Sequence, residues 1–75
     1  MVARQQVVNK LRAIGFTYSR QGERVDLYRR KGSGNCELAA VPRRDLLSEA
    51  YVINLLTRHG VSIEEAMAFC GTAKT

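Results

Sequence analysis

The hydrophobic periodicity of this chain changes at Gly15, and no other feature constrains the fold as strongly. Over residues 3–14, apolar side chains recur at intervals of three and four residues, which is the spacing of an amphipathic helix. Gly15 follows directly, at the place where a residue in the left-handed conformation commonly ends a helix. From Phe16 onward, apolar and polar residues alternate as they do in a strand. The sequence therefore predicts a helix followed by a sheet.

Turn signals divide the alternating part into three segments. Gln21-Gly22 interrupts the first two, which predicts an antiparallel hairpin. Residues 29–35 predict a second, looser turn, and Pro42 is expected to end the third strand. The strands are expected at residues 16–20, 24–28 and 36–41.

The last third of the chain is helical again. Apolar residues from Leu46 to Leu56 recur at helical spacing, with Ser48 or Asp45 as the N-cap and Gly60 just beyond the end. A capping box at residues 62–65 predicts a short third helix.

Together these elements predict a single α+β domain over residues 1–75, in the order α-β-β-β-α-α. We expect the helices to pack on one face of a three-stranded antiparallel sheet. The spacing of Tyr51, Met67 and Phe69 is typical of core residues. A chain of 75 residues builds one core and leaves little room for a buried group, so we expect no cofactor and no metal site.

The sequence favours a cytoplasmic protein without a membrane segment. No apolar run approaches the ~20 residues that span a bilayer, and residues 1–10 are too polar for a signal peptide. Cys36 and Cys70 lie far apart without the spacing of a zinc or redox site, and we expect both to be free thiols.

Positive charge gathers in the first part of the chain. The formal net charge is +5, and residues 1–31 contain eight Lys or Arg against two acidic residues, whereas residues 32–75 contain four against five. This asymmetry favours a polyanionic partner. The alternative is a surface that is charged for solubility alone.

Four stretches of the sequence together match a known pattern. They are the helix end Leu11–Phe16, the hairpin Arg20–Arg30, the strand end Ala40–Pro42 and the segment Leu55–Glu65, and they cover most of the chain. In this order they resemble the HicA, or YcfA-like, family of RNA-targeting toxins. The resemblance implies a compact fold similar to the double-stranded RNA-binding domain, and an activity on messenger RNA. It also implies a partner, because HicB antitoxins cover the active face of these toxins.

The family's catalytic histidine, part of a Gly-Ser-His sequence entering the second strand, is absent. Aligned without gaps from Gly15, its position falls on Val25; deleting one residue earlier in the hairpin places residues 22–24 on the motif. We expect the second register, because strand alternation would turn Val25 and Leu27 toward the helices and Arg24 outward. An arginine stays protonated, so Arg24 can hold a phosphate but cannot act as a base. The resemblance leaves open whether the chain cleaves RNA.

The basic hairpin is the predicted RNA-binding surface, with Tyr28 on the same strand face as Arg24. Cations at groove spacing suit an RNA backbone. The alternative is a solvated strand face in which Asp26 pairs with a neighbouring arginine. Arg43 and Arg44 either extend this surface or lie beside the next helix without a specific role. The predicted residues are Arg20, Arg24, Tyr28, Arg29, Arg30, Lys31, Arg43 and Arg44.

His59 is the one histidine of the sequence, and its place before Gly60 favours a cap on the helix dipole over catalysis. Our first hypothesis is an RNA-binding, HicA-like toxin component of a toxin–antitoxin pair. The alternative is a non-catalytic regulator that binds nucleic acid or a protein. A third hypothesis, an interaction protein without RNA affinity, predicts binding that does not respond to salt.

Overall fold

The computed structural model describes residues 1–32 and 34–73 and confirms the predicted α+β class, with a three-stranded antiparallel sheet and three helices. The predicted loose turn at residues 29–35 includes Ser33, which lies outside the described residues. Residues 29–31 of this predicted turn belong instead to the second strand of the sheet. The elements are β1 (Val2–Ala3), α1 (Arg4–Ala13), β2 (Thr17–Gln21), β3 (Val25–Lys31), β4 (Cys36–Pro42), β5 (Leu46–Leu47), α2 (Glu49–Arg58) and α3 (Ile63–Thr72).

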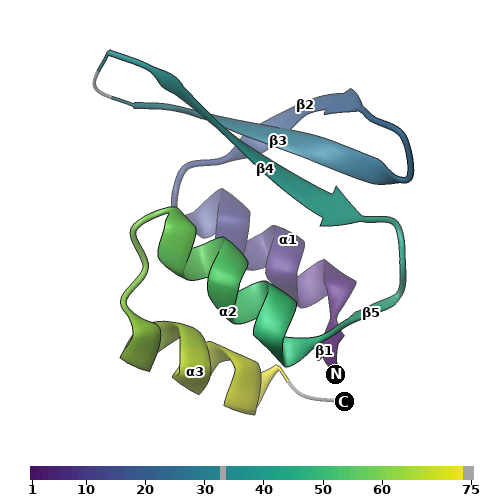
Figure 1. Ribbon diagram of the computed structural model, residues 1–75, viewed down its shortest axis with the longest axis vertical. Helices are drawn as coiled ribbons and strands as arrows, with labels where there is room; N and C mark the ends of the chain where they lie inside the picture. The colour runs from purple at the N-terminus through teal and green to yellow at the C-terminus, as the bar shows by residue number, and fades with distance from the viewer. Residues whose placement is uncertain (33, 74–75) are drawn as a thin grey trace.

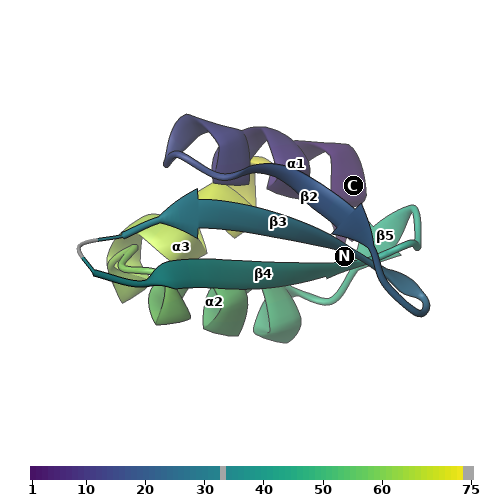
Figure 2. The same ribbon diagram turned by 90° about the horizontal axis from the view of Figure 1, so that it is seen from above.

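The helices all lie on one side of the sheet formed by β2, β3 and β4 (Figure 1). Helices α1 and α2 lie next to the sheet, and α3 packs against α2 on the side away from it. Figure 2 looks onto the opposite side of the sheet, which no helix of the described chain covers. We call this side the outer face, and the side toward the helices the inner face.

The helix ends follow from the local sequence. Gly15 has a φ of +105° and ends α1, after which the Phe16 amide returns to the Leu11 carbonyl at 2.9 Å. Ser48, one of the two expected N-caps of α2, accepts a hydrogen bond from the Tyr51 amide at 3.2 Å. Each of these bonds satisfies a backbone group that a helix end leaves without a partner.

The third helix begins as its capping box predicts. Ser62 accepts a hydrogen bond from the Glu65 amide at 3.1 Å. Leu46 and Leu47, however, are not helical. They form β5 and pair antiparallel with Val2 and Ala3. This small second sheet was not predicted, because a contact between two-residue strands so far apart in sequence leaves no local pattern.

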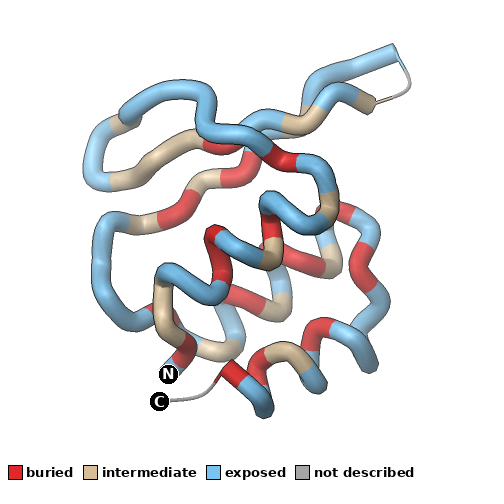
Figure 3. The backbone as a smooth tube through the Cα atoms, turned by 180° about the vertical axis from the view of Figure 1, so that it is seen from behind, coloured by how far each residue is buried: buried red, intermediate tan, exposed pale blue. Residues whose placement is uncertain are grey.

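The core lies between the inner face and the helices. Buried positions concentrate in the helices and in the parts of β3 and β4 that face them, whereas β2 is exposed along its whole length (Figure 3). The largest fully buried side chains are Phe16, Leu11, Leu56, Val2, Val7, Val41, Val52 and Cys70.

The predicted orientation of β3 is wrong. Tyr28 is buried at 5% exposure, and Asp26 and Arg30 contact the helix layer, so these three alternating residues form the inner face of the strand. Val25 and Leu27 therefore lie on the outer face. Burying the Tyr28 ring removes more apolar surface from water than burying either aliphatic side chain would.

Candidate nucleic-acid interface

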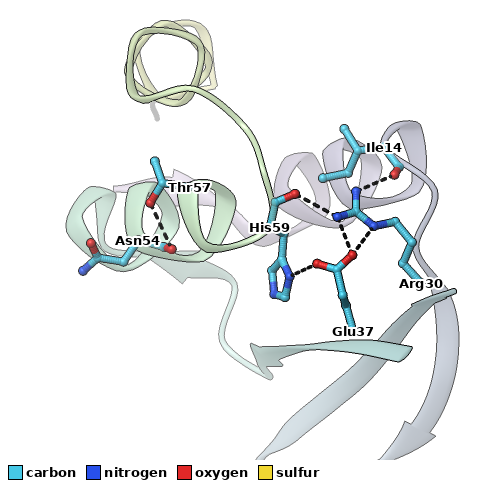
Figure 4. Close-up of polar contacts among 6 residues, drawn as sticks. All are labelled: Ile14, Arg30, Glu37, Asn54, Thr57 and His59. Carbon is cyan, nitrogen blue, oxygen red and sulfur yellow. Dashed lines mark hydrogen bonds and ion pairs between the residues drawn. The ribbon is translucent and has the colours of Figure 1, made fainter. Parts of the chain in front are cut away.

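Arg30 joins the sheet to the ends of two helices. Its Nη1 donates to the Ile14 carbonyl at 3.0 Å, and its Nη2 donates to the His59 carbonyl at 2.9 Å (Figure 4). These residues cap α1 and α2 at their C-termini, where the helix dipoles favour a cation. Glu37 on β4 accepts from Arg30 Nε and Nη2 at 2.9 and 2.7 Å. The guanidinium also lies 4.8 Å from the centroid of the Phe16 ring.

His59 belongs to the same cluster and is buried beneath the sheet. Its Nδ1 lies 3.0 Å from Oε1 of Glu37, and its ring packs edge-on against Phe16 at 4.9 Å between centroids. The predicted position at the end of α2 is confirmed, because His59 is the C-cap residue. The side chain is only 6% exposed, so it cannot reach a ligand on the outer face.

Asp26 forms a second ionic cluster at the other end of β3. Its two carboxylate oxygens accept from Arg4 at 2.6 Å and from Arg43 at 3.1 Å. Arg43 also donates to the carbonyls of Gly22 and Val25 at 3.1 and 2.8 Å, which fixes the segment after β4 to the base of the β2–β3 hairpin. Asp26 does pair with arginines, but it does so on the inner face and with residues outside the hairpin, so this pairing does not decide whether the outer strand face is merely solvated.

These two clusters determine the charge of the outer face. Asp26 and Glu37 are the acidic residues of the three-stranded sheet, and both point to the inner face, where arginines and a histidine bind them. On the outer face, Arg20 lies opposite Leu27, and Arg29 and Lys31 follow along β3.

The outer-face cations keep their charge exposed. In the described part of the chain, neither these three side chains nor Arg24 form an ion pair or hydrogen bond, and all four are exposed. Successive outward residues on a strand are about 7 Å apart. The sheet therefore presents a row of cations on its outer face, while its own acidic residues, Asp26 and Glu37, point to the inner face. We call Arg20, Arg24, Arg29 and Lys31 the cationic face.

Arg24 lies in the loop of the β2–β3 hairpin with a φ of +62°, a left-handed conformation that costs a residue with a Cβ atom about 1 kcal/mol. Its carbonyl accepts from the Arg43 amide at 3.2 Å, so the strained residue is held by the segment after β4. Glu23 precedes it and is exposed as well. Non-glycine residues in this conformation concentrate at functional sites.

Four of the eight predicted site residues lie outside the cationic face. Tyr28 is a core residue, and its ring meets Tyr18 edge-on at 5.7 Å between centroids. Arg30 is turned to the inner face by the two helix ends, and Arg43 is held by the hairpin base. Arg44 is exposed and forms no ion pair with a described residue.

The structure removes the reason for aligning the family's histidine with Arg24 rather than with Val25. Strand alternation favours the Arg24 register only if Val25 faces the helices, yet Val25 lies on the outer face, as the ungapped register requires. Under either register, the aligned position carries no imidazole: Arg24 is exposed in the hairpin loop, and Val25 is half-buried on the outer face. The only histidine of the sequence lies on the opposite side of the sheet.

Sequence reasoning assigned Tyr51 and Met67 to the core, and both are exposed, at 38% and 57%. Tyr51 lies instead against the edge of β4, where its hydroxyl donates to the Ala40 carbonyl at 2.5 Å. It lines a pocket of about 360 Å³ together with Arg24 and Arg44. The sequence signal for this site is weak, because the pocket walls come from four separate segments.

The thiols are free, as expected: Cys36 is exposed on β4 and Cys70 is buried in α3. Burial raises the pKa of the Cys70 thiol, which keeps it protonated. No group of His, Cys, Asp and Glu in residues 1–32 and 34–73 is arranged to hold a metal ion. Within the same residues, no helix is long and apolar enough to cross a membrane.

Comparison with known proteins identifies no similar protein. A scan against protein-family models, a search of curated proteins and a search of solved structures each return no match.

Proposed function

We propose that this chain binds RNA through the cationic face, as a component of a HicA-like toxin–antitoxin pair that acts by binding rather than by histidine-dependent cleavage. One observation carries the proposal. The acidic residues of the sheet are neutralised on the inner face, while three cations on the helix-free side, and Arg24 in the adjoining hairpin loop, have no anionic partner in the described chain. A bound polyanion would supply the negative charges that these cations lack within the described chain.

RNA is the preferred polyanion because the cations lie in a regular row along the sheet, at a spacing that can follow the phosphates of a backbone. Contacts to phosphates and 2′-hydroxyls dominate the recognition of RNA backbones. Leu27 and Leu38 lie between and beside the cations on the outer face and offer apolar surface to a ribose or base. A cytoplasmic location is part of this proposal, since messenger RNA is found there.

Binding without cleavage is proposed because no histidine lies on the cationic face. The cationic face contains arginines and a lysine, and a guanidinium stays protonated at neutral pH. His59 is buried on the other side of the sheet, and its ring contacts Glu37 and Phe16. Arginine can stabilise a transition-state charge, but an arginine is a poor proton-transfer group because its guanidinium stays protonated.

The test uses labelled RNA with the wild type and with a double variant, Arg29→Gln with Lys31→Gln. We expect the double variant to bind at least tenfold more weakly at low salt, with the RNA recovered intact from every sample. The matched control is Arg12→Gln with Arg58→Gln. It removes the same charge from the exposed ends of α1 and α2, and we expect it to bind within about twofold of the wild type. Equal losses in the two double variants would contradict a defined RNA-binding face.

The second candidate partner is an acidic protein such as an antitoxin, which the same uncovered cations would suit. Competition decides between the two, since an acidic protein that binds this face must displace the labelled RNA. Protein binding to the wild type in the absence of any RNA binding would favour the partner over the nucleic acid.

A further inference from the structure

A pocket of about 360 Å³ opens at the end of the sheet where the cationic face meets the start of α2. Its volume lies in the range of sites that hold small organic groups. Its apolar walls include Val25, Pro42, Leu46 and the ring of Tyr51. These come from β3, β4, β5 and α2, so the pocket exists only in the folded chain.

Two exposed arginines, Arg24 and Arg44, also line the pocket, and neither forms an ion pair with a described residue. Among the described residues that line the pocket, none is acidic. An apolar cavity beside two cations without counterions is complementary to a flat apolar group that carries a negative charge nearby. A nucleotide, with its base and phosphate, has this chemistry.

The aromatic wall is held in place. The Tyr51 hydroxyl donates to the Ala40 carbonyl on β4, so the ring is fixed at the sheet edge. Burial raises the pKa of this hydroxyl, which therefore stays a hydrogen-bond donor at neutral pH. Ordering the ring before a ligand arrives reduces the entropy cost of stacking on it.

The pocket also lies at one end of the cationic face. Arg24 belongs to both, and Val25 to Lys31 span about 20 Å along β3. The backbone of an RNA strand that follows this row therefore reaches the pocket at Arg24. A base paired in a duplex cannot enter the pocket, because stacking and pairing hold it inside the helix.

We propose that this pocket takes one unstacked base of a single-stranded RNA segment, with Arg24 and Arg44 holding the phosphates beside it. This inference rests on the proposed function and adds its substrate class, which is unpaired rather than duplex RNA. Val25, Pro42 and Leu46 supply the apolar contacts, and the Tyr51 ring supplies the stacking surface.

The experiment compares a single-stranded RNA of about 12 nucleotides with the duplex of the same sequence. The wild type is expected to bind the single strand about tenfold more tightly than the duplex. Tyr51→Leu keeps an apolar wall and removes the ring, and it is expected to lose this preference while binding the duplex like the wild type. Tyr51→Phe keeps the ring without its hydroxyl and is expected to retain the preference.

Each other outcome has a defined meaning. If Tyr51→Leu keeps the wild-type preference, or if Tyr51→Phe loses as much as Tyr51→Leu, the pocket is not a base site and the inference is overturned. If adenosine 5′-monophosphate binds as tightly as the single strand, the occupant is a free nucleotide and the assignment to RNA is overturned. The proposed function survives these results as long as Arg29→Gln with Lys31→Gln weakens the binding of both RNAs, and it fails separately if the wild type binds neither.

Discussion

The Nδ1 atom of His59 lies 3.0 Å from Oε1 of Glu37, so a contact between two titratable side chains joins the end of α2 to β4. Figure 4 shows Arg30 completing this cluster from β3. The hydrogen bonds from His59 and then Arg30 hold the pKa of Glu37 below its ordinary value of 4.5.

This lowered pKa predicts a loss of stability in acid. The unfolded chain takes up the Glu37 proton near pH 4.5, and the folded chain takes it up only at lower pH. The stability that this group contributes is therefore fully present above about pH 4.5 and is lost as the pH falls through the folded pKa. Urea unfolding between pH 3 and pH 7 measures the free energy of unfolding. As the pH falls, this free energy should decrease less for Glu37→Gln than for the wild type. Glu64→Gln, at an exposed position of α3, should follow the wild type, and a Glu37→Gln profile parallel to it would contradict the proposed role.

Arg29 and Arg30 are neighbours on opposite faces of the sheet, and their variants should separate binding from stability. Arg30→Met removes hydrogen bonds to two helix-end carbonyls and to Glu37, and we expect it to lower the free energy of unfolding by about 2 kcal/mol. Arg29→Met should change it by less than about 0.5 kcal/mol and weaken RNA binding. Denaturant titration and RNA binding of each folded variant test this, and a stability loss for Arg29→Met equal to that for Arg30→Met would refute the assignment of faces.

The conformation of Arg24 predicts an unusual glycine substitution. Because the residue has a φ of +62°, Arg24→Gly relieves backbone strain that Arg24→Ala retains. We expect the glycine variant to be about 1 kcal/mol more stable than the alanine variant, and both to bind RNA more weakly than the wild type to the same degree. Chemical denaturation measures the difference, and an alanine variant at least as stable as the glycine variant would argue against the strained loop.

The inward orientation of Tyr28 can be tested against its neighbour Leu27. Tyr28→Ala empties part of the core and should cost about 3 kcal/mol of folding free energy, whereas Leu27→Ala on the outer face should cost about 1 kcal/mol or less. Thermal unfolding of the two variants provides the comparison. A larger loss of stability for Leu27→Ala than for Tyr28→Ala would instead support the orientation in which Val25 and Leu27 face the helices.

The sequence predicts most of the fold because its helix ends have local signals. Gly15, Ser48 and Ser62 act at the positions where a cap or a left-handed residue is needed, and each of these positions is confirmed. The pairing of β1 with β5 had no such signal, since it depends on Val2 meeting Leu47 after the chain has folded.

The orientation of β3 was not predictable from alternation, because both phases of the strand contain apolar residues. Val25 and Leu27 occupy one phase and Tyr28 the other, so hydrophobicity alone does not decide. The decision comes from contacts distant in sequence. Arg30 reaches two helix ends, and Asp26 reaches Arg4 at the start of α1. The cations of the candidate site could therefore be predicted, but not which of them face outward.

The salt dependence of RNA binding tests the central claim most directly. If the four cations of the cationic face neutralise RNA phosphates, a plot of log affinity against log salt for a single strand should have a slope of about −2.8, which is a loss of roughly 50-fold between 50 and 200 mM salt. The Arg29→Gln, Lys31→Gln variant should reduce the slope to about −1.4, while Arg12→Gln, Arg58→Gln should leave it unchanged. A slope that is the same in all three proteins, or near zero in the wild type, would contradict RNA binding through this face.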